Sequence, residues 1–205
     1  MNIIDHMRVW IYDRAVVSMT ASWYRAVLGR MPLGCRVLDI GVGTGSALLA
    51  NADILIGKGI HVTGVDVDAA YIGHCKLEVA YRGLAERINV RLESVYDHKG
   101  GPYDAAYFSA SFMLLPDPLA ALQHIRSLLL PEARLYFTQT FEHKSSRFVE
   151  STKPLLRLLT TIDFGRVTYE RDFRKTLVAG GILLERLEVL HAGKRRSAIL
   201  ATARA

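Results

Sequence analysis

The hydrophobic and polar positions of this chain follow two periods, one typical of strands and one typical of helices. An apolar stripe with spacings of three and four residues runs through residues 8–28 and predicts a helix. Short apolar runs that end on polar or glycine positions predict strands at 37–40, 61–66, 88–93, 104–109 and 134–139. Two final runs, 182–190 and 197–202, predict a closing antiparallel pair. Helical segments between the strands make this an expected α/β fold.

Length and composition fit one compact domain. The chain has 205 residues, of which 50% are apolar and 22% charged, enough to bury a sizeable core. No apolar run is long enough to cross a membrane, and Asp5 and Asp13 leave no uncharged segment for a signal peptide. The two cysteines lie far apart and the histidines are scattered. We therefore expect no disulfide framework, no metal and a reducing, cytoplasmic location.

The chain is basic, with a net charge of +6. Most lysines and arginines are spread along it, and the one triplet, Lys194–Arg196, falls in the turn of the closing pair. Such an excess favours anionic partners: nucleic acid, an acidic lipid surface or a phosphorylated substrate. A solvated basic surface without a partner fits the same pattern, so peripheral membrane association stays open.

The most informative segment is the glycine-rich turn after the first predicted strand. Asp39 lies near the end of that strand, and Gly41, Gly43 and Gly45 alternate through the turn before an apolar helix begins. Glycine allows a tight backbone and lets N–H groups approach a ligand without an intervening Cβ. Asp39 is expected to point a carboxylate into the resulting cleft. A strand-to-helix turn that binds no ligand is the simpler alternative.

The spacing of the turn indicates its ligand. A dinucleotide fingerprint, G-x-G-x-x-G/A, needs a small third position where this chain has Ser46. The pattern D-x-G-x-G-x-G instead resembles motif I of the class I S-adenosylmethionine (SAM) methyltransferases, whose ligand carries a sulfonium and an amino group. Asp66 ends the second predicted strand, 25 residues after Gly41, where a carboxylate can accept both ribose hydroxyls. Val67 would then lie against the adenine.

The resemblance extends over residues 33–141, where five predicted strands match the family in order. It implies a Rossmann-like, seven-stranded, mostly parallel sheet of order 3-2-1-4-5-7-6 with helices on both faces, and SAM as cofactor. It also implies a helical cap at 1–32, a SAM-binding core at 33–141, and C-terminal helices with the last two strands at 142–205. The residues around the turn that it assigns to the cofactor are Asp39, Gly41, Val42, Gly43, Thr44 and Gly45.

The resemblance is weaker at the adenine end of the site. The family commonly carries an acid after the third strand, which accepts a hydrogen bond from the adenine 6-amino group. This chain has Ser94 there and Glu93 just before it, so the contact is open between the two. Val95 and Ser109 complete the expected cofactor pocket. The first helix carries aromatic residues, expected either in the core or as a cover over the ligand: Trp10, Tyr12, Trp23 and Tyr24.

The segment after the fourth predicted strand disfavours several acceptor classes. Residues 109–112 read Ser-Ala-Ser-Phe. They lack the Asn/Asp-Pro-Pro-aromatic, Pro-Cys and acidic patterns typical of enzymes that methylate adenine or glutamine, cytosine C5 and catechols. The double-glutamate hairpin of protein arginine methyltransferases is missing too. By elimination the chain resembles the small methyltransferases of quinone and phospholipid head-group biosynthesis, which implies a small-molecule or lipid-like acceptor methylated on N, O or C.

The acceptor pocket is expected to include Tyr12, Ser111, Phe112 and Gln139. His143 is a candidate base because imidazole titrates near neutral pH, with Tyr12 or no side-chain base as alternatives. Two other functions stay open: an RNA or protein methyltransferase that uses the basic surface, and a catalytically silent SAM-fold subunit that binds a partner. The residues do not indicate an oligomeric state.

Overall fold

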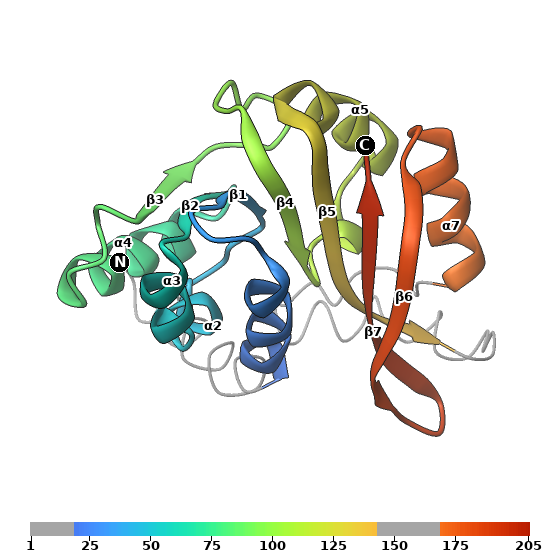
Figure 1. The fold of residues 1–205 in the computed structure, drawn as a ribbon, viewed down its shortest axis with the longest axis horizontal. Helices are drawn as coiled ribbons and strands as arrows, with labels where there is room; N and C mark the ends of the chain where they lie inside the picture. Colours follow the sequence, from blue (N-terminus) through green and yellow to red (C-terminus); the bar gives the residue numbers. More distant parts are fainter. Residues whose placement is uncertain (1–18, 143–168) are drawn as a thin grey trace.

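The computed structural model describes residues 19–142 and 169–205 (Figure 1). These residues form a seven-stranded sheet of order β3-β2-β1-β4-β5-β7-β6, which confirms the predicted order. Its strands are β1 (Arg36–Ile40), β2 (His61–Asp66), β3 (Ile88–Leu92), β4 (Tyr103–Ser109), β5 (Leu129–Glu142), β6 (Leu183–Ala192) and β7 (Arg196–Arg204). Tyr12 and His143, the two expected catalytic residues, lie outside the described residues.

The direction of the strands defines where a ligand is expected. β1 to β5 pair in parallel, and β7 runs antiparallel between β5 and β6. The chain passes from β1 to β2 and β3 on one side and returns to β4 on the other, so the strand order reverses beside β1. Ligands of open α/β sheets bind at the carboxyl ends of the strands at such a reversal. In Figure 1 the carboxyl ends of β4 and β5 lie at the lower edge of the sheet.

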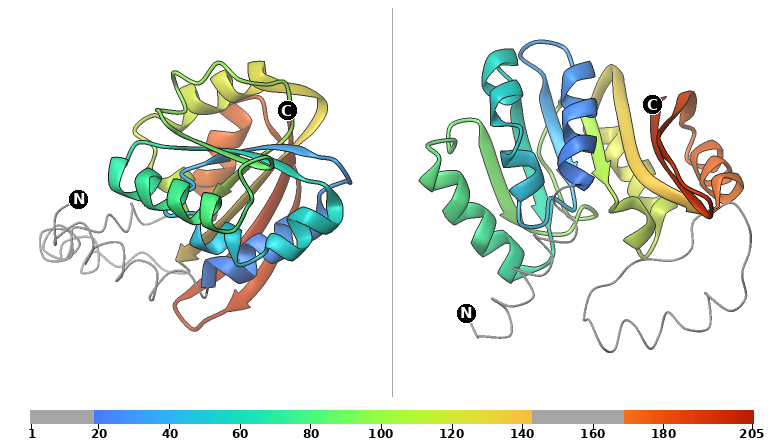
Figure 2. Two further views of the ribbon diagram at one scale, coloured as in Figure 1. Left: turned by 90° about the vertical axis from the view of Figure 1, so that its left-hand side faces the viewer. Right: turned by 90° about the horizontal axis from the view of Figure 1, so that it is seen from below.

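Helices cover both faces of the sheet, as predicted (Figure 2). One face carries a helix at residues 19–30, α2 (Ser46–Leu49), α3 (Ala52–Lys58) and α4 (Ala69–Tyr81). The other face carries the 3-10 turn η1 (Phe112–Leu114), α5 (Pro118–Leu128) and α7 (Glu170–Ala179). Each layer has its own cluster of buried apolar side chains, and the sheet separates the two clusters.

The helix at 19–30 is the described part of the expected helical cap, and it packs directly on the sheet. Trp23 and Val27, from the predicted apolar stripe, are buried together with Tyr24 and Leu28. Met19, on the same predicted stripe, is half exposed. This helix therefore places a tyrosine, Tyr24, against the sheet near the carboxyl end of β1.

The start of β5 differs from the prediction. The sequence predicts a helix to Leu130, a turn at 131–133 and a strand from Arg134. Instead α5 ends at Leu128, and β5 begins at once. Glu132 has a φ of 67°, and the pairing with β4 jumps from Tyr103–Leu129 to Ala105–Arg134. The predicted turn is a bulge inside a strand, because the residues on both sides of it find partners on β4.

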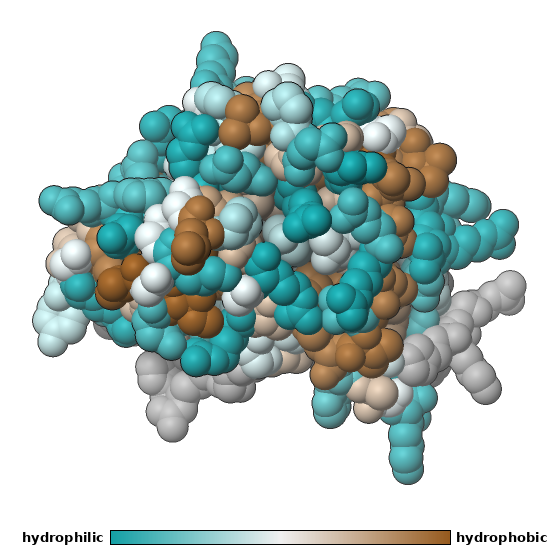
Figure 3. Space-filling model, viewed as in Figure 1, coloured by the Kyte–Doolittle hydropathy of each residue, from teal (hydrophilic) through white to brown (hydrophobic). Residues whose placement is uncertain are grey.

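Exposed apolar side chains gather on the β6 side of the molecule. Figure 3 shows hydrophobic surface over β6 and β7, and Leu183 and Val189 of β6 are 58% and 61% exposed. β6 is the edge strand, with a partner on one side only. In the part of the chain that the structure describes, no helix is long and apolar enough to cross a membrane.

Candidate functional site

The glycine-rich turn joins β1 to α2 and has no room for side chains at two of its glycines. Gly41, Gly43 and Gly45 have φ values of 75°, 59° and 71°, a region that other L-residues rarely adopt. A Cβ on Gly41 would lie 2.5 Å from Cβ of Ser111, and a Cβ on Gly45 would lie 2.3 Å from Sγ of Cys75. The backbone of the turn therefore packs directly against the segment after β4 and against α4.

This packing predicts a measurable loss of stability. Gly41→Ala is expected to lower the free energy of unfolding by about 2–4 kcal/mol, because it adds a clash to a strained backbone conformation. Adding Ser111→Gly removes the clashing Cβ and restores part of the loss, whereas Ser111→Ala keeps that Cβ and restores none. Urea denaturation followed by circular dichroism measures all three proteins. Equal stability of Gly41→Ala and the wild type would contradict the close approach.

Asp39 lies one residue before the end of β1 and is 1% exposed. The Tyr24 hydroxyl donates to its Oδ2 at 2.7 Å, whereas its Oδ1 has no hydrogen-bond partner among the described residues. Burial raises the pKa of Asp39 to about 7; the Tyr24 hydrogen bond opposes this rise and the charge of Asp66 adds to it. A buried oxygen without a partner is unfavourable by about 1–3 kcal/mol, so a ligand that donates to it is bound favourably.

Asp66 is the last residue of β2 and joins two loops. Its Oδ2 accepts the N–H of Gly43 at 2.9 Å, and its Oδ1 accepts the N–H of Asp68 at 2.9 Å. Asp68 in turn accepts from two N–H groups of the first turn of α4 and caps this helix. Burial raises the pKa of Asp66, against the hydrogen bonds from Asp68 and Gly43. The next residue, Val67, is 74% exposed and offers an apolar surface to a planar ligand.

A hollow lies between the glycine-rich turn and the helix at 19–30. Five residues of the expected cofactor pocket line it: Gly41, Val42, Thr44, Gly45 and Ser109. Tyr24, which was expected in the core or as a cover over the ligand, lines it too, as do three residues that were not predicted there: Thr20, Ser46 and Ala47. The last two directly follow the turn, so extending the motif would have found them. Thr20 and Tyr24 come from another helix, whose position over the turn depends on the tertiary fold.

The polar atoms of the hollow fit SAM. The Ser109 hydroxyl, which lines the hollow, is buried and has no hydrogen-bond partner among the described residues. Oδ1 of Asp39 is likewise buried without a described partner, and Asp39 is joined to the lining through Tyr24. None of the residues that line the hollow is basic. A positively charged ligand with hydrogen-bond donors is therefore favoured there, and the anionic pyrophosphate of a dinucleotide is repelled by the carboxylate. In the described part of the chain, no cluster of His, Cys, Asp and Glu could hold a metal ion.

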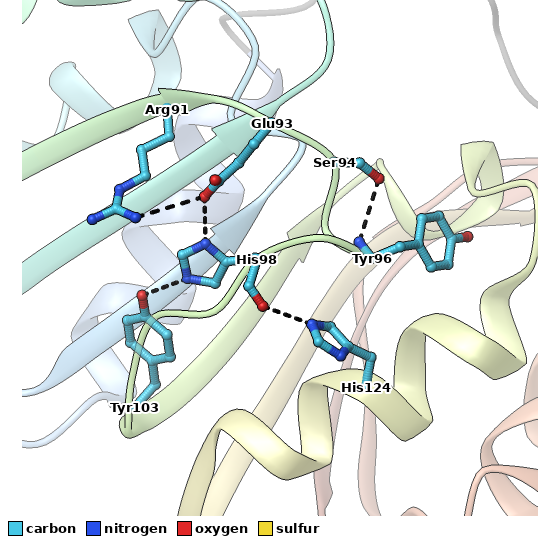
Figure 4. Close-up of polar contacts among 7 residues, drawn as sticks. All are labelled: Arg91, Glu93, Ser94, Tyr96, His98, Tyr103 and His124. Atoms are coloured by element: carbon cyan, nitrogen blue, oxygen red, sulfur yellow. Dashed lines mark hydrogen bonds and ion pairs between the residues drawn. The ribbon is translucent and has the colours of Figure 1, made fainter.

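The loop after β3 carries both candidates for the adenine contact, and they lie in different surroundings (Figure 4). Glu93 accepts a hydrogen bond from Nδ1 of His98. His98 is fully buried, and its Nε2 lies 2.8 Å from the Tyr103 hydroxyl. The Ser94 hydroxyl accepts the N–H of Tyr96 at 3.3 Å and lies outside this network. Glu93 is therefore engaged in holding the fold, whereas Ser94 has a local turn contact.

Of the residues expected around the acceptor, Ser111 and Phe112 have partners within the fold, whereas the side chain of Gln139 has none among the described residues. The Ser111 hydroxyl donates to the carbonyl of Ile40, at the end of β1. Phe112 is buried, with its ring edge-on to three others: Phe108, Phe137 and Phe173. The structure thus gives Ser111 and Phe112 packing roles. Gln139 on β5 is 1% exposed, and neither its amide nitrogen nor its amide oxygen has a hydrogen-bond partner among the described residues.

Two other surface features are separate from the hollow. Lys194 and Arg195 lie in the β6–β7 turn, and Arg196 begins β7. This turn lies on the far side of the sheet from β2. A wide, open depression on α7 is lined by Glu170, Arg171, Arg174, Lys175, Val178 and Ala179. No residue that lines this depression has a buried polar atom without a described partner, in contrast to Ser109 of the hollow.

Comparison with known proteins agrees with this geometry. Residues 38–135 match the family model described as a methyltransferase domain. A ubiquinone biosynthesis O-methyltransferase of Xylella fastidiosa (strain 9a5c) is 33% identical over 111 residues, which is 52% of this chain and 43% of that protein. The match thus spans less than half the length of this curated relative.

Solved structures share the fold over most of the chain. The cyclase SpnF has a TM-score of 0.74 at 17% identity, with 90% of this chain and 80% of that one covered. The mitomycin 7-O-methyltransferase MmcR has a TM-score of 0.72 at 21% identity, with 95% and 56% covered. At these identities the likeness shows the fold alone.

The sheet order, with the glycine-rich turn after β1, defines a Rossmann-like methyltransferase fold. The family match over residues 38–135 adds the relationship in sequence. The fold of this chain is therefore that of the class I SAM-dependent methyltransferases, and residues 38–135 match a methyltransferase domain in sequence.

Proposed function

We propose that this protein is an enzyme that transfers the methyl group of SAM to a small-molecule or lipid-like acceptor. The observation that carries the proposal is the buried Oδ1 of Asp39, an acceptor without a described partner beside the glycine-rich turn. A ligand with an amino group satisfies this atom and balances its charge. SAM, the cofactor of this family, carries such an amino group together with a ribose and an adenine.

Each part of SAM has a proposed site on the chain. Asp39 holds the amino group, Asp66 the ribose hydroxyls, and Val67 packs against the adenine. Ser94 is the favoured contact for the adenine edge, because Glu93 is held by His98. When bound, SAM supplies a methyl group on a positively charged sulfur. The chain's own residues bind and orient this group and exclude water from it.

The chain does not need elaborate acid–base machinery for such a transfer. The donor is already activated, so alignment of donor and acceptor in a water-free site provides much of the acceleration. A base is needed only where the acceptor has a proton to lose. His143 and Tyr12 are our candidates for that base, on the sequence argument alone.

The proposed acceptor class is inferred from Gln139. Alternation along β5 places Gln139 on the same face as Phe137 and Phe141, near the carboxyl end of the strand. A buried amide whose donor and acceptor both lack a partner in the described part of the chain suits a planar molecule with a hydroxyl or carbonyl group, such as a hydroxylated ring. The curated relative and MmcR are O-methyltransferases by name, which favours oxygen as the methylated atom.

Turnover with a panel of acceptors tests the proposal. The protein is incubated with SAM and with hydroxylated aromatics, amines or lipids, and S-adenosylhomocysteine (SAH) is measured by mass spectrometry. We expect SAH formation with at least one class, and we expect Gln139→Leu to lower that rate at least ~10-fold while SAH binding is kept. Thr140→Val changes the residue that follows Gln139 on β5 and is the matched control. No acceptor-dependent SAH formation by protein that binds SAH would contradict the proposed activity.

A further inference from the structure

We propose that Tyr24 and Asp39 form a proton-linked receptor for the amino group of the cofactor, so that the cofactor binds with release of a proton from Asp39 to solvent. The inference rests on the proposed function, because it concerns the same hollow. It adds a positioning residue, Tyr24, and a pH dependence that neither the family match nor the fold implies.

The first support is the geometry of the carboxyl group. The Tyr24 hydroxyl donates a hydrogen bond to Oδ2 of Asp39 at 2.7 Å, and Oδ1 is buried without a described partner. Tyr24 lines the hollow, and its hydroxyl joins Asp39, which lies behind it, to this lining. One oxygen of Asp39 is therefore held in place, while the other is available to a donor from the ligand.

The second support is the set of groups that face Asp39. Tyr24 faces it from the helix at 19–30, Tyr107 from β4, Asp66 from β2 and Cys75 from α4. All four are neutral or acidic, and no ion pair among the described residues includes Asp39. Within residues 19–142 and 169–205 the carboxylate therefore has no cation to balance it, and a bound ligand with an ammonium group would supply one.

These surroundings explain the direction of the titration. Burial raises the pKa of Asp39 to about 7, which is far above the usual range for an aspartic acid. Below about pH 7 the free protein thus holds a proton on Asp39, whereas a bound ammonium group requires the carboxylate. Affinity is expected to rise about tenfold per pH unit up to pH ~7 and to level off above it, with one proton released per ligand at low pH.

Tyr24 acts on this titration through its hydroxyl alone. The hydroxyl donates to the carboxylate and so favours the charged form. Tyr24→Phe keeps the ring and its edge contact with Tyr107, whose centroid is 4.9 Å away, and removes only this donor. The rising part of the pH profile is therefore expected to move to higher pH by roughly one unit.

Calorimetry of SAH binding between about pH 5.5 and 8, in buffers with different heats of ionisation, measures both affinity and proton release. We expect the affinity of the wild type to rise with pH and then level off, the profile of Tyr24→Phe to be displaced to higher pH, and Asp39→Asn to bind weakly and without pH dependence. The matched ligand is 5′-methylthioadenosine, which lacks the amino acid part; its binding is expected not to change with pH.

Three results would overturn the inference. They are pH-independent binding of SAH by the wild type, a pH profile that persists in Asp39→Asn and thereby points to Asp66, and an equal profile for 5′-methylthioadenosine. The wild-type profile is decisive even if a variant fails to fold. Absence of SAH binding at every pH would instead overturn the proposed function, and the receptor with it.

Discussion

Asp66→Asn is expected to weaken the binding of SAH by about 30-fold or more, equivalent to roughly 2 kcal/mol, measured by calorimetry. The carboxylate of Asp66 is the proposed acceptor for the ribose hydroxyls, and an amide nitrogen cannot accept. The two oxygens also accept the N–H groups of Gly43 and Asp68, so an amide nitrogen would also face one of these donors. The loss therefore includes a disturbed turn as well as a missing ligand contact.

Asp68→Asn is the matched control for this experiment. It removes the same charge two residues away, while its amide oxygen can still accept from the first turn of α4. SAH binding within about threefold of the wild type is expected for this variant. If Asp66→Asn and Asp68→Asn bound SAH equally well, Asp66 would have no place in the cofactor site.

His98→Leu is expected to have the largest effect on stability, lowering the free energy of unfolding by about 3–4 kcal/mol. His98 is fully buried, with Nδ1 on Glu93 and Nε2 on Tyr103. A carboxylate only accepts, so Nδ1 carries the proton, and in the neutral ring Nε2 accepts from the tyrosine hydroxyl. Leucine leaves the Tyr103 hydroxyl unpaired in a place almost inaccessible to water, and it takes from Glu93 its buried partner, so that Glu93 keeps, among the described residues, only the ion pair with Arg91.

A double variant separates this effect from a simple packing defect. In His98→Leu/Tyr103→Phe the hydroxyl that has lost its partner is removed as well, so about 1 kcal/mol or more of the stability is expected to return. Urea denaturation measures the wild type, both single variants and the double variant. Losses that simply add would show that the hydroxyl and the ring are not coupled.

The strands and their order could be predicted from the sequence, and each part of the prediction rests on a different physical feature. Central strands buried on both faces are nearly continuous apolar runs, so β1, β2 and β4 are visible without any knowledge of the fold. The turn after β1 can be recognised in the sequence because three alternating glycines mark backbone positions with a positive φ. The bulge in β5 was not predicted. Pro131 and Glu132 are typical of a turn when only their neighbours in the sequence are considered, and the pairing with β4 that makes them part of a strand depends on the tertiary fold.

The same distinction applies to the site. Asp39 and Asp66 were predicted as ligands because each lies at or next to the end of a strand, at the edge where ligands bind, and both remain predictions. The Tyr24–Asp39 hydrogen bond could not be predicted, since it joins a helix and a strand whose relative register is set by packing. The engagement of Glu93 by a buried histidine, and that of Ser111 by the carbonyl of Ile40, were hidden for the same reason. Patterns in the sequence indicate which residues reach the edge of the sheet, but not which of them are already paired there.

The central claim is that the hollow beside Asp39 binds SAM, and calorimetry of SAH against the wild-type protein at pH 7.5 tests it most directly. NADH, titrated in parallel, carries the anionic pyrophosphate that the carboxylate should repel. We expect SAH to bind with a dissociation constant in the micromolar range and NADH not to bind detectably. Folded protein that fails to bind SAH, or that binds NADH more tightly, would contradict this claim.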